Sequence, residues 1–171
     1  MEGRFLWTLM ATDIATGWSE SLPIVMRDGA VVLTALQLIR RQLPFPLRGI
    51  DADNDPVFMN SLMEAWCDRP GQQIVLTRSR AYKSNDQAWV EQKNGMLVRR
   101  VVGYQRLVSL EAAQALGELY GALRLFTNLF QPSFKLKSSE RDGGRIKRQN
   151  HPPRTPLQRL LATGQVSEEK A

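Results

Sequence analysis

The sequence contains one cysteine, Cys67, and one histidine, His151, so most chemistry that depends on these side chains is excluded. A single cysteine cannot form an intramolecular disulfide or a cysteine-rich zinc site, and its surroundings in "LMEAWCDR" favour a small core residue. A single histidine in a proline-rich tail excludes histidine clusters, although it leaves room for a lone base. No apolar run approaches the length of a membrane span, and "MEGRFLW" has no signal-peptide pattern. These features are typical of a cytoplasmic protein.

Acidic residues are outnumbered in this chain. The 23 Lys and Arg residues against 17 Asp and Glu give a formal net charge of +6 and a pI near 9.9. Such a surplus favours an anionic partner, with nucleic acid as the first expectation. Many basic proteins bind no nucleic acid, so the charge is only supporting evidence. The length of 171 residues suffices for one domain with a core, or for a domain with a tail.

Hydrophobic patterning predicts alternating strands and helices. Residues 4–12 and 18–25 are rich in aromatic and branched side chains, which favours two strands joined by the turn "DIATG". The further expectations are a helix at 29–43 capped by Asp28, a strand at 47–53, a helix at 56–69, a strand at 72–78, a helix from Ser84 to about Arg100 and a helix from about Leu110 to Leu129. This order predicts an α/β domain with one mixed sheet.

The last part of the chain differs in composition. Residues 131–154 contain seven Lys or Arg against two acids, and pairs of glycine and proline interrupt them. A solvated, mobile tail and an arm that contacts phosphates both fit this pattern. The segment "TPLQRLLA", 155–162, predicts a short terminal helix. We therefore divide the chain into a core at 1–130 and a basic tail at 131–171.

Three aspartates, Asp51, Asp53 and Asp55, lie in "GIDADND", where the third predicted strand ends. One interpretation is an aspartate-rich turn without chemistry. A calcium loop of the EF-hand type is excluded, because its sixth position would be Pro56 and its twelfth Leu62. The remaining interpretation is a ligand site at the carboxyl end of a strand, where open α/β sheets bind their ligands.

A further carboxylate, Glu91, lies in the predicted helix "SNDQAWVEQKNGMLVRR". Ser84 and Gln87 have the spacing of a capping box, which places the helix start at Ser84 or the next residue. Helical spacing then puts Glu91 on a polar stripe with Gln87 and Asn94. A lone glutamate on such a stripe is usually a solvated surface residue, and only the aspartate cluster suggests a metal site.

Several segments together resemble the catalytic domains of DDE transposases, which are related to retroviral integrases. "DADNDPVFMN" resembles their Asp-Asn-Gly-x-x-Phe-x-Asn segment, and "TRSRAYKSNDQAWVEQKNGMLVR" resembles the segment that holds their final Glu. "FTNLFQPSFKL" and "PPRTPLQRLLA" resemble the end of the same domain. The resemblance runs from Glu2 to about Thr163, and its specificity lies in the ordered set of segments.

The resemblance implies an RNase H-like fold in which three carboxylates hold two Mg²⁺ or Mn²⁺ ions for attack on phosphodiesters. Asp53 matches the second carboxylate of the family and Glu91 the third, with 37 residues between them. Asp55 occupies the family's glycine position, and Asn54 and Phe58 are in register only with Asp53. DNA is the implied partner, together with a second copy of the chain or a full-length transposase.

In the family, the region around the final Glu lines the DNA. The resemblance therefore implies DNA contacts for Arg78, Arg80, Lys83, Lys93, Arg99 and Arg100. Lys93 would lie about 200° from Glu91 around a helix, so it would reach DNA only from the flank. Each of these residues could equally be a surface charge that serves solubility.

The family's first Asp has no counterpart in this sequence. "RFLWTLMATD" resembles the family's second strand, so we expect the first strand to be missing and the chain to be an N-terminally truncated transposase. Asp13 falls in a turn where the family often has a non-catalytic Asp, and we reject it as a ligand. Without a central first strand, we expect the hairpin at 4–25 to be poorly anchored or to pair directly with strand 47–53.

Two functions follow from this interpretation. One is DNA transposition or integration by metal-dependent strand transfer, complete only if further sequence supplies the first Asp. The other is a catalytically inactive remnant that binds DNA or a partner transposase. A weaker alternative is an RNase H-like nuclease with an unrelated substrate.

Overall fold

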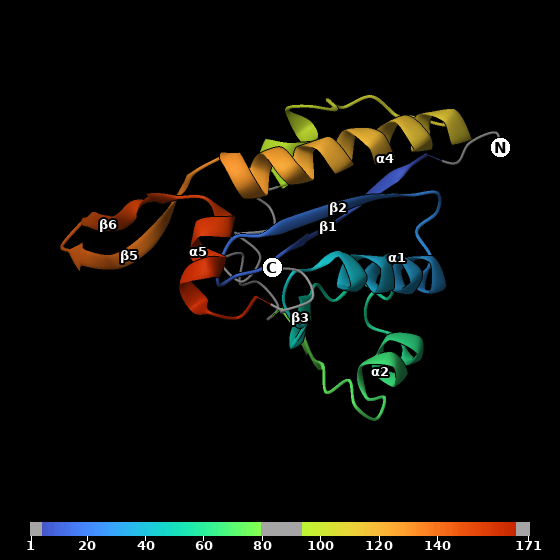
Figure 1. Ribbon diagram of the computed structural model, residues 1–171, viewed down its shortest axis with the longest axis horizontal. Coiled ribbons are helices and arrows are strands. Elements are labelled where there is room, and N and C mark those ends of the chain that lie inside the picture. Colours follow the sequence, from blue (N-terminus) through green and yellow to red (C-terminus); the bar gives the residue numbers. More distant parts are fainter. Residues whose placement is uncertain (1–4, 80–93, 167–171) are drawn as a thin grey trace.

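The computed structural model describes residues 5–79 and 94–166, in which strands and helices alternate (Figure 1). In chain order the elements are β1 (Trp7–Thr12), β2 (Ser19–Ile24), α1 (Gly29–Gln42), β3 (Gly49–Ala52), α2 (Ser61–Cys67), β4 (Val75–Arg78), the π-helical turn η2 (Asn94–Arg99), α4 (Leu110–Leu125), the π-helical turn η3 (Phe126–Phe130), β5 (Ser133–Asp142), β6 (Arg145–Arg154) and α5 (Pro156–Thr163). The α/β class that we predicted is confirmed. Of the helices described, none has the length and apolar character needed to cross a membrane.

Local capping decides where the first two helices begin. Asp28 caps α1 as predicted, because its carboxylate accepts hydrogen bonds from two backbone N–H groups of the first turn. α2 begins at Ser61, later than predicted. Asn60 accepts a hydrogen bond from the N–H of Met63 at 3.0 Å and donates one to the carbonyl of Val57 at 2.9 Å. These bonds close a turn before the helix, so that the preceding residues do not join it.

β1 and β2 form an antiparallel hairpin that is paired over the full length of both strands, as predicted. Asp13 holds the turn between them. Its carboxylate accepts hydrogen bonds from the backbone N–H of Thr16 at 2.7 Å and from the Thr16 hydroxyl at 2.6 Å. Asp and Thr side chains that bind their own backbone in this way favour turns, so the turn follows from its local sequence.

The β1–β2 hairpin is anchored by side chains of α4 and η3. Asn128, which is 0% exposed, accepts a hydrogen bond from the N–H of Ser19 at 2.9 Å and donates one to the Ser19 carbonyl at 2.8 Å. The carboxylate of Glu20, 2% exposed, lies 2.7 Å from Arg124 and accepts a hydrogen bond from Trp18 at 2.7 Å. Our expectation of a poorly anchored hairpin is therefore wrong, because these side chains hold the outer edge of β2.

The strands form three separate two-stranded sheets, β1–β2, β3–β4 and β5–β6, and not the single mixed sheet that we predicted. β3 and β4 are parallel, with Gly49 opposite Val75 and Ala52 opposite Arg78. Within the described residues, no strand pairs with the outer edge of β1 or of β3, so the expected direct pairing of these two strands is also not found. Side-chain packing, and not backbone pairing, joins the first two sheets.

One apolar core connects these two sheets. α1 lies on one side of the β1–β2 hairpin and α4 on the other (Figure 1). Val32, Leu36 and Ile39 of α1 are buried at helical spacing, as the periodicity predicted. The same cluster contains Leu9 and Ile24 from the hairpin, and Ile50 and Leu76 from β3 and β4 pack against it.

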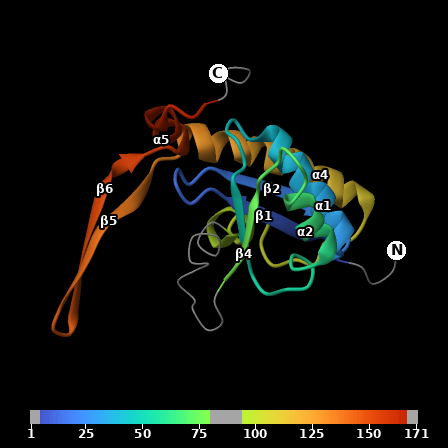
Figure 2. The ribbon, with the colours of Figure 1, turned by 90° about the horizontal axis from the view of Figure 1, so that it is seen from below.

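The basic tail takes the form of an arm. β5 and β6 form a long antiparallel hairpin that projects from the rest of the molecule, and α5 returns the chain to the body (Figure 2). Gly143 and Gly144 form the tip, and Gly143 has a φ of +58°, which favours glycine. A Gly-Gly pair between extended segments is a hairpin signal that the prediction of a tail did not weigh. The predicted terminal helix is confirmed as α5, which begins with a capping box of Thr155 and Gln158.

Candidate functional site

The three aspartates around the end of β3 have different partners. Asp51 accepts a hydrogen bond from the hydroxyl of Thr77 at 2.8 Å, which ties it to β4. Asp55 forms an ion pair with Arg27. Asp53 accepts one hydrogen bond, at 3.2 Å, from the backbone N–H two residues further on, and no hydrogen bond or ion pair joins its side chain to another element among the described residues. Of the three carboxylates, that of Asp53 is the one without a hydrogen bond or ion pair to another element in the described structure.

Several hydrogen bonds hold the ends of β3 and β4 together. The N–H of Ser79 donates to the carbonyl of Ala52 at 2.8 Å, and the side-chain amide of Asn54 donates to the carbonyl of Ser79 at 3.1 Å. Arg78 is exposed and lies opposite Ala52, the residue before Asp53. The carboxyl ends of two parallel strands thus meet at one edge, where open α/β sheets bind their ligands.

The structure describes four of the eight site residues that the sequence predicts. Asp53 and Arg78 lie at the shared end of β3 and β4. Arg99 and Arg100, both exposed, lie at the end of η2, and the guanidinium of Arg99 is 6.0 Å from the ring centre of Tyr104. η2 lies beside α4, across the β1–β2 hairpin from β3, so these two arginines are not brought next to Asp53 (Figure 1). The other predicted residues fall outside the described ranges: Arg80, Lys83, Glu91 and Lys93.

A metal centre would need more ligands than these ranges supply. In residues 5–79 and 94–166, no three His, Cys, Asp or Glu side chains gather where they could hold a metal ion. Asp53 offers the hard carboxylate oxygens that Mg²⁺ prefers. The carboxylate of Asp13 instead shapes the turn between β1 and β2. The described residues therefore contribute one candidate ligand, Asp53, to which the sequence prediction adds Glu91.

The sequence comparisons give one close relative and no family. No family model matches the chain. The chain is 54% identical over 157 residues to a protein of Sinorhizobium fredii that is described as uncharacterized protein y4rM. The match takes in 92% of this chain and 44% of the relative, so this chain spans less than half the length of that protein.

Solved structures show the class of fold. The crystal structure of the catalytic core domain of BIV integrase matches with a TM-score of 0.58 and 23% identity, over 92% of this chain and 86% of that chain. The cryoEM structure of the simian T-cell lymphotropic virus intasome, in complex with the PP2A regulatory subunit B56 gamma, matches with a TM-score of 0.57 and 15% identity, over 76% of this chain and 45% of that chain. This chain therefore has a fold similar to that of the integrase catalytic core in these structures.

Proposed function

We propose that this chain is the core of a DNA transposition or integration domain, in which Asp53 and Glu91 are two of the metal-binding carboxylates. The observation that carries the proposal is the shared end of β3 and β4. Asp53 lies there with a carboxylate that no other described element engages, and β4 leads directly into the segment that contains Glu91. The integrase-like fold and the transposase-like segments around both residues support the same assignment.

Asp53 and Glu91 would hold Mg²⁺ or Mn²⁺. The residues fit these ions in chemistry, because both ions prefer oxygen ligands and carboxylates supply them. When bound, a pair of such ions activates a water or a 3′-hydroxyl for attack on a phosphodiester and stabilises the leaving oxygen. The chain itself would add positive charge beside the site through Arg78, which is exposed at the same strand end.

A third carboxylate is proposed to lie on a further strand. The outer edges of β1 and β3 both carry backbone groups without a strand partner in the described structure. A strand placed between them would satisfy these groups and join the two sheets into one. We propose that such a strand carries the first Asp beside Asp53, and that a longer form of this protein or a partner transposase supplies it.

DNA is the proposed substrate. Arg78, exposed at the strand end beside Asp53, would contact it, and three further basic residues lie close to Glu91 in sequence: Arg80, Lys83 and Lys93. The turn η2, at whose end Arg99 and Arg100 lie, is across the β1–β2 hairpin from β3, so these two residues would contact a more distant part of the duplex (Figure 1). Transposition needs two DNA ends to be held together, which favours a homo-oligomer or an assembly with full-length transposase.

A second candidate is a DNA-binding protein without catalytic activity. It is favoured by the net charge of +6, which supports DNA binding and requires no metal-dependent chemistry. The two candidates share the DNA-binding surface and differ only in whether Asp53 and Glu91 take part in chemistry.

A strand-joining assay with Mg²⁺ separates the two candidates. We would compare the 171-residue chain with a form extended by the in-frame sequence encoded upstream. The extended form should join strands, and Asp53→Asn or Glu91→Gln should lower its rate by more than about 100-fold, since even indirect partners of metal ligands are worth about 10–100-fold.

Asp51→Asn is the matched control, because Asp51 lies two residues away and is engaged by Thr77. Its joining rate should stay within a few fold of the unmodified form. Equal losses for Asp51→Asn and Asp53→Asn would count against the assignment of Asp53. DNA binding without joining in any extended form would support the inactive candidate.

A further inference from the structure

The β5–β6 arm is fixed to the body at its base. The guanidinium of Arg159, on α5, donates hydrogen bonds to the carbonyl of Thr16 at 2.9 Å and to the hydroxyl of Ser133 at 3.2 Å. The ammonium of Lys135 donates to the carbonyl of Ala15. Both anchors join β5 to the turn between β1 and β2. The direction of the arm relative to the body is therefore set by contacts at one end.

Outward from this base, both faces of the ribbon are open. Residues 139–141 and 146–150 are exposed, and no third strand pairs with β5 or β6 in the described structure. A two-stranded hairpin without a covering layer is marginally stable in water, so an arm of this length is expected to gain order from a partner. Its ten-residue strands span about 33 Å.

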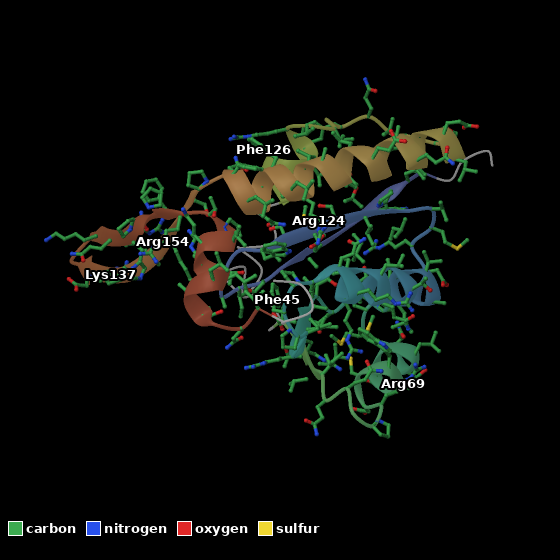
Figure 3. All side chains as sticks on the ribbon, viewed as in Figure 1. Phe45, Arg69, Arg124, Phe126, Lys137 and Arg154 are labelled. Atoms are coloured by element: carbon green, nitrogen blue, oxygen red, sulfur yellow. The ribbon has the colours of Figure 1, made fainter. Side chains whose placement is uncertain are left out.

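The arm carries most of the surplus charge of the chain. The 22 residues from 133 to 154 contain seven Lys or Arg and two acids, a net charge of +5, whereas the whole chain has +6. The rest of the molecule is therefore close to neutral. Figure 3 shows Lys137 and Arg154 on this arm, far from Arg69 at the opposite end of the molecule. An anionic partner would be drawn to the arm before any other surface.

The strand register sorts the charges between the two faces of the arm. Glu140 lies directly opposite Lys147, so opposite charges face each other on one side. Arg141, and Arg148 opposite Ser139, lie on the other side, because neighbouring residues of a strand alternate between faces. No acidic residue lies on this second face in the described ribbon. The side chains of the two arginines form no hydrogen bond or ion pair with another described residue.

We propose that the β5–β6 arm binds duplex DNA along its major groove, with the face of Arg141 and Arg148 toward the DNA. The major groove admits a two-stranded β-ribbon, and arginine donates to both phosphates and guanine edges. The length of the arm is close to one turn of B-DNA, about 34–36 Å. The proposal rests on the proposed function, in which DNA is the substrate. It adds a contact surface outside the strand-end site.

Double-stranded RNA fits the arm less well. Its major groove is deep and narrow, so a ribbon with side chains on both faces cannot enter it. An acidic protein surface would also complement the positive charge of the arm. If such a surface were the partner, the arm would show no preference for duplex nucleic acid. Both alternatives serve as competitors in the tests below.

The first test measures how the affinity of the 171-residue chain for duplex DNA depends on salt, between about 50 and 200 mM. Arg141→Gln with Arg148→Gln should lower the slope of log K against log salt by about 1.8, since each lost phosphate contact removes about 0.9. Arg48→Gln with Arg69→Gln is the matched control. These residues are exposed, and neither belongs to the arm or the strand-end site. Equal losses in both double variants, or none in the arm variant, would overturn the proposal.

The second test asks which face meets the DNA. Ser138 and Ser139 are neighbours on opposite faces, because Ser139 is paired with Arg148 and Ser138 with Gln149. Each would be changed to Cys and labelled with a photo-crosslinker in a Cys67→Ala background. Normalised for labelling, Ser139→Cys should crosslink duplex DNA several-fold more than Ser138→Cys. Equal or reversed yields would refute the proposed orientation. Unlabelled duplex DNA, double-stranded RNA and an acidic protein would then be added as competitors. If RNA or the acidic protein lowered the crosslinking as much as duplex DNA does, duplex DNA would not be the partner.

Failure of this proposal can be told from failure of the proposed function. If the arm variants bind like the unmodified chain while Asp53→Asn abolishes joining in the extended form, only the arm proposal is wrong. If the arm variants lose affinity but Asp53→Asn joins normally, only the site assignment is wrong. If the unmodified chain binds no duplex DNA, the arm proposal is wrong, and if the extended form also joins no strands, both proposals are wrong.

Discussion

Asn128 provides the sharpest test of how the β1–β2 hairpin is held. Asn128→Ala removes the acceptor for the N–H of Ser19 and the donor for its carbonyl, at distances of 2.9 and 2.8 Å. Ser19 is 2% exposed and Asn128 is 0% exposed, so water cannot easily replace either bond. Each buried group left without a partner costs about 1–3 kcal/mol. The substitution should therefore lower the free energy of unfolding by about 2–6 kcal/mol.

This loss is large compared with the total stability of a domain, about 5–15 kcal/mol. For a chain of this length it corresponds to a fall in Tm of about 5–20 °C. Urea and thermal unfolding, followed by circular dichroism, would measure it. Asn150→Ala is the matched control, because Asn150 is exposed on the arm, and its effect should stay within about 0.5 kcal/mol. A loss of less than about 1 kcal/mol for Asn128→Ala would refute the idea that its amide replaces a neighbouring strand.

Two further predictions concern buried groups of the core. Glu20→Ala should lower the free energy of unfolding by roughly 3 kcal/mol. This value lies at the lower end of the range for broken buried ion pairs, because 29% of the Arg124 side chain is exposed. An unchanged midpoint of urea unfolding would contradict the prediction. Burial, with a smaller contribution from Asp68, raises the pKa of the Cys67 thiol, so the folded state favours the neutral thiol. The neutral thiol of Cys67 should contribute fully to the free energy of unfolding at a pH below the ordinary thiol pKa. This contribution should be lost as the pH rises toward the raised pKa of the folded state. Cys67→Ala should therefore show a shallower alkaline loss of stability than the unmodified chain, and parallel pH profiles would count against the shift.

Several parts of the candidate site could be predicted from sequence, because their signals are local. The run that ends in "GIDADND" predicts a strand followed by a polar turn, and β3 does end immediately before Asp53. The sequence could not rank the three aspartates by their surroundings. Their partners, Thr77 for Asp51 and Arg27 for Asp55, come from other elements of the fold. Only these contacts distinguish Asp53 as the carboxylate without a partner on another element of the described structure.

The sequence by itself determined the elements whose signals lie within a few residues. It predicted the β1–β2 hairpin from its turn residues, the start of α1 from Asp28, and the helical segments at α4 and α5. It also showed the positive charge of residues 131–154. It did not determine their shape, because a segment with a Gly-Gly pair can be either a mobile tail or a hairpin.

Only the tertiary structure decided how strand edges are satisfied. The pairing of β1 with β2 alone, and the contact of Asn128 with Ser19 across 109 residues, depend on which segments meet in space. Hydrogen bonds between distant backbone groups leave no periodic trace in the sequence, because any residue supplies the same N–H and C=O groups. For the same physical reason, the division of charge between the two faces of the arm became visible only once the register of β5 and β6 was known.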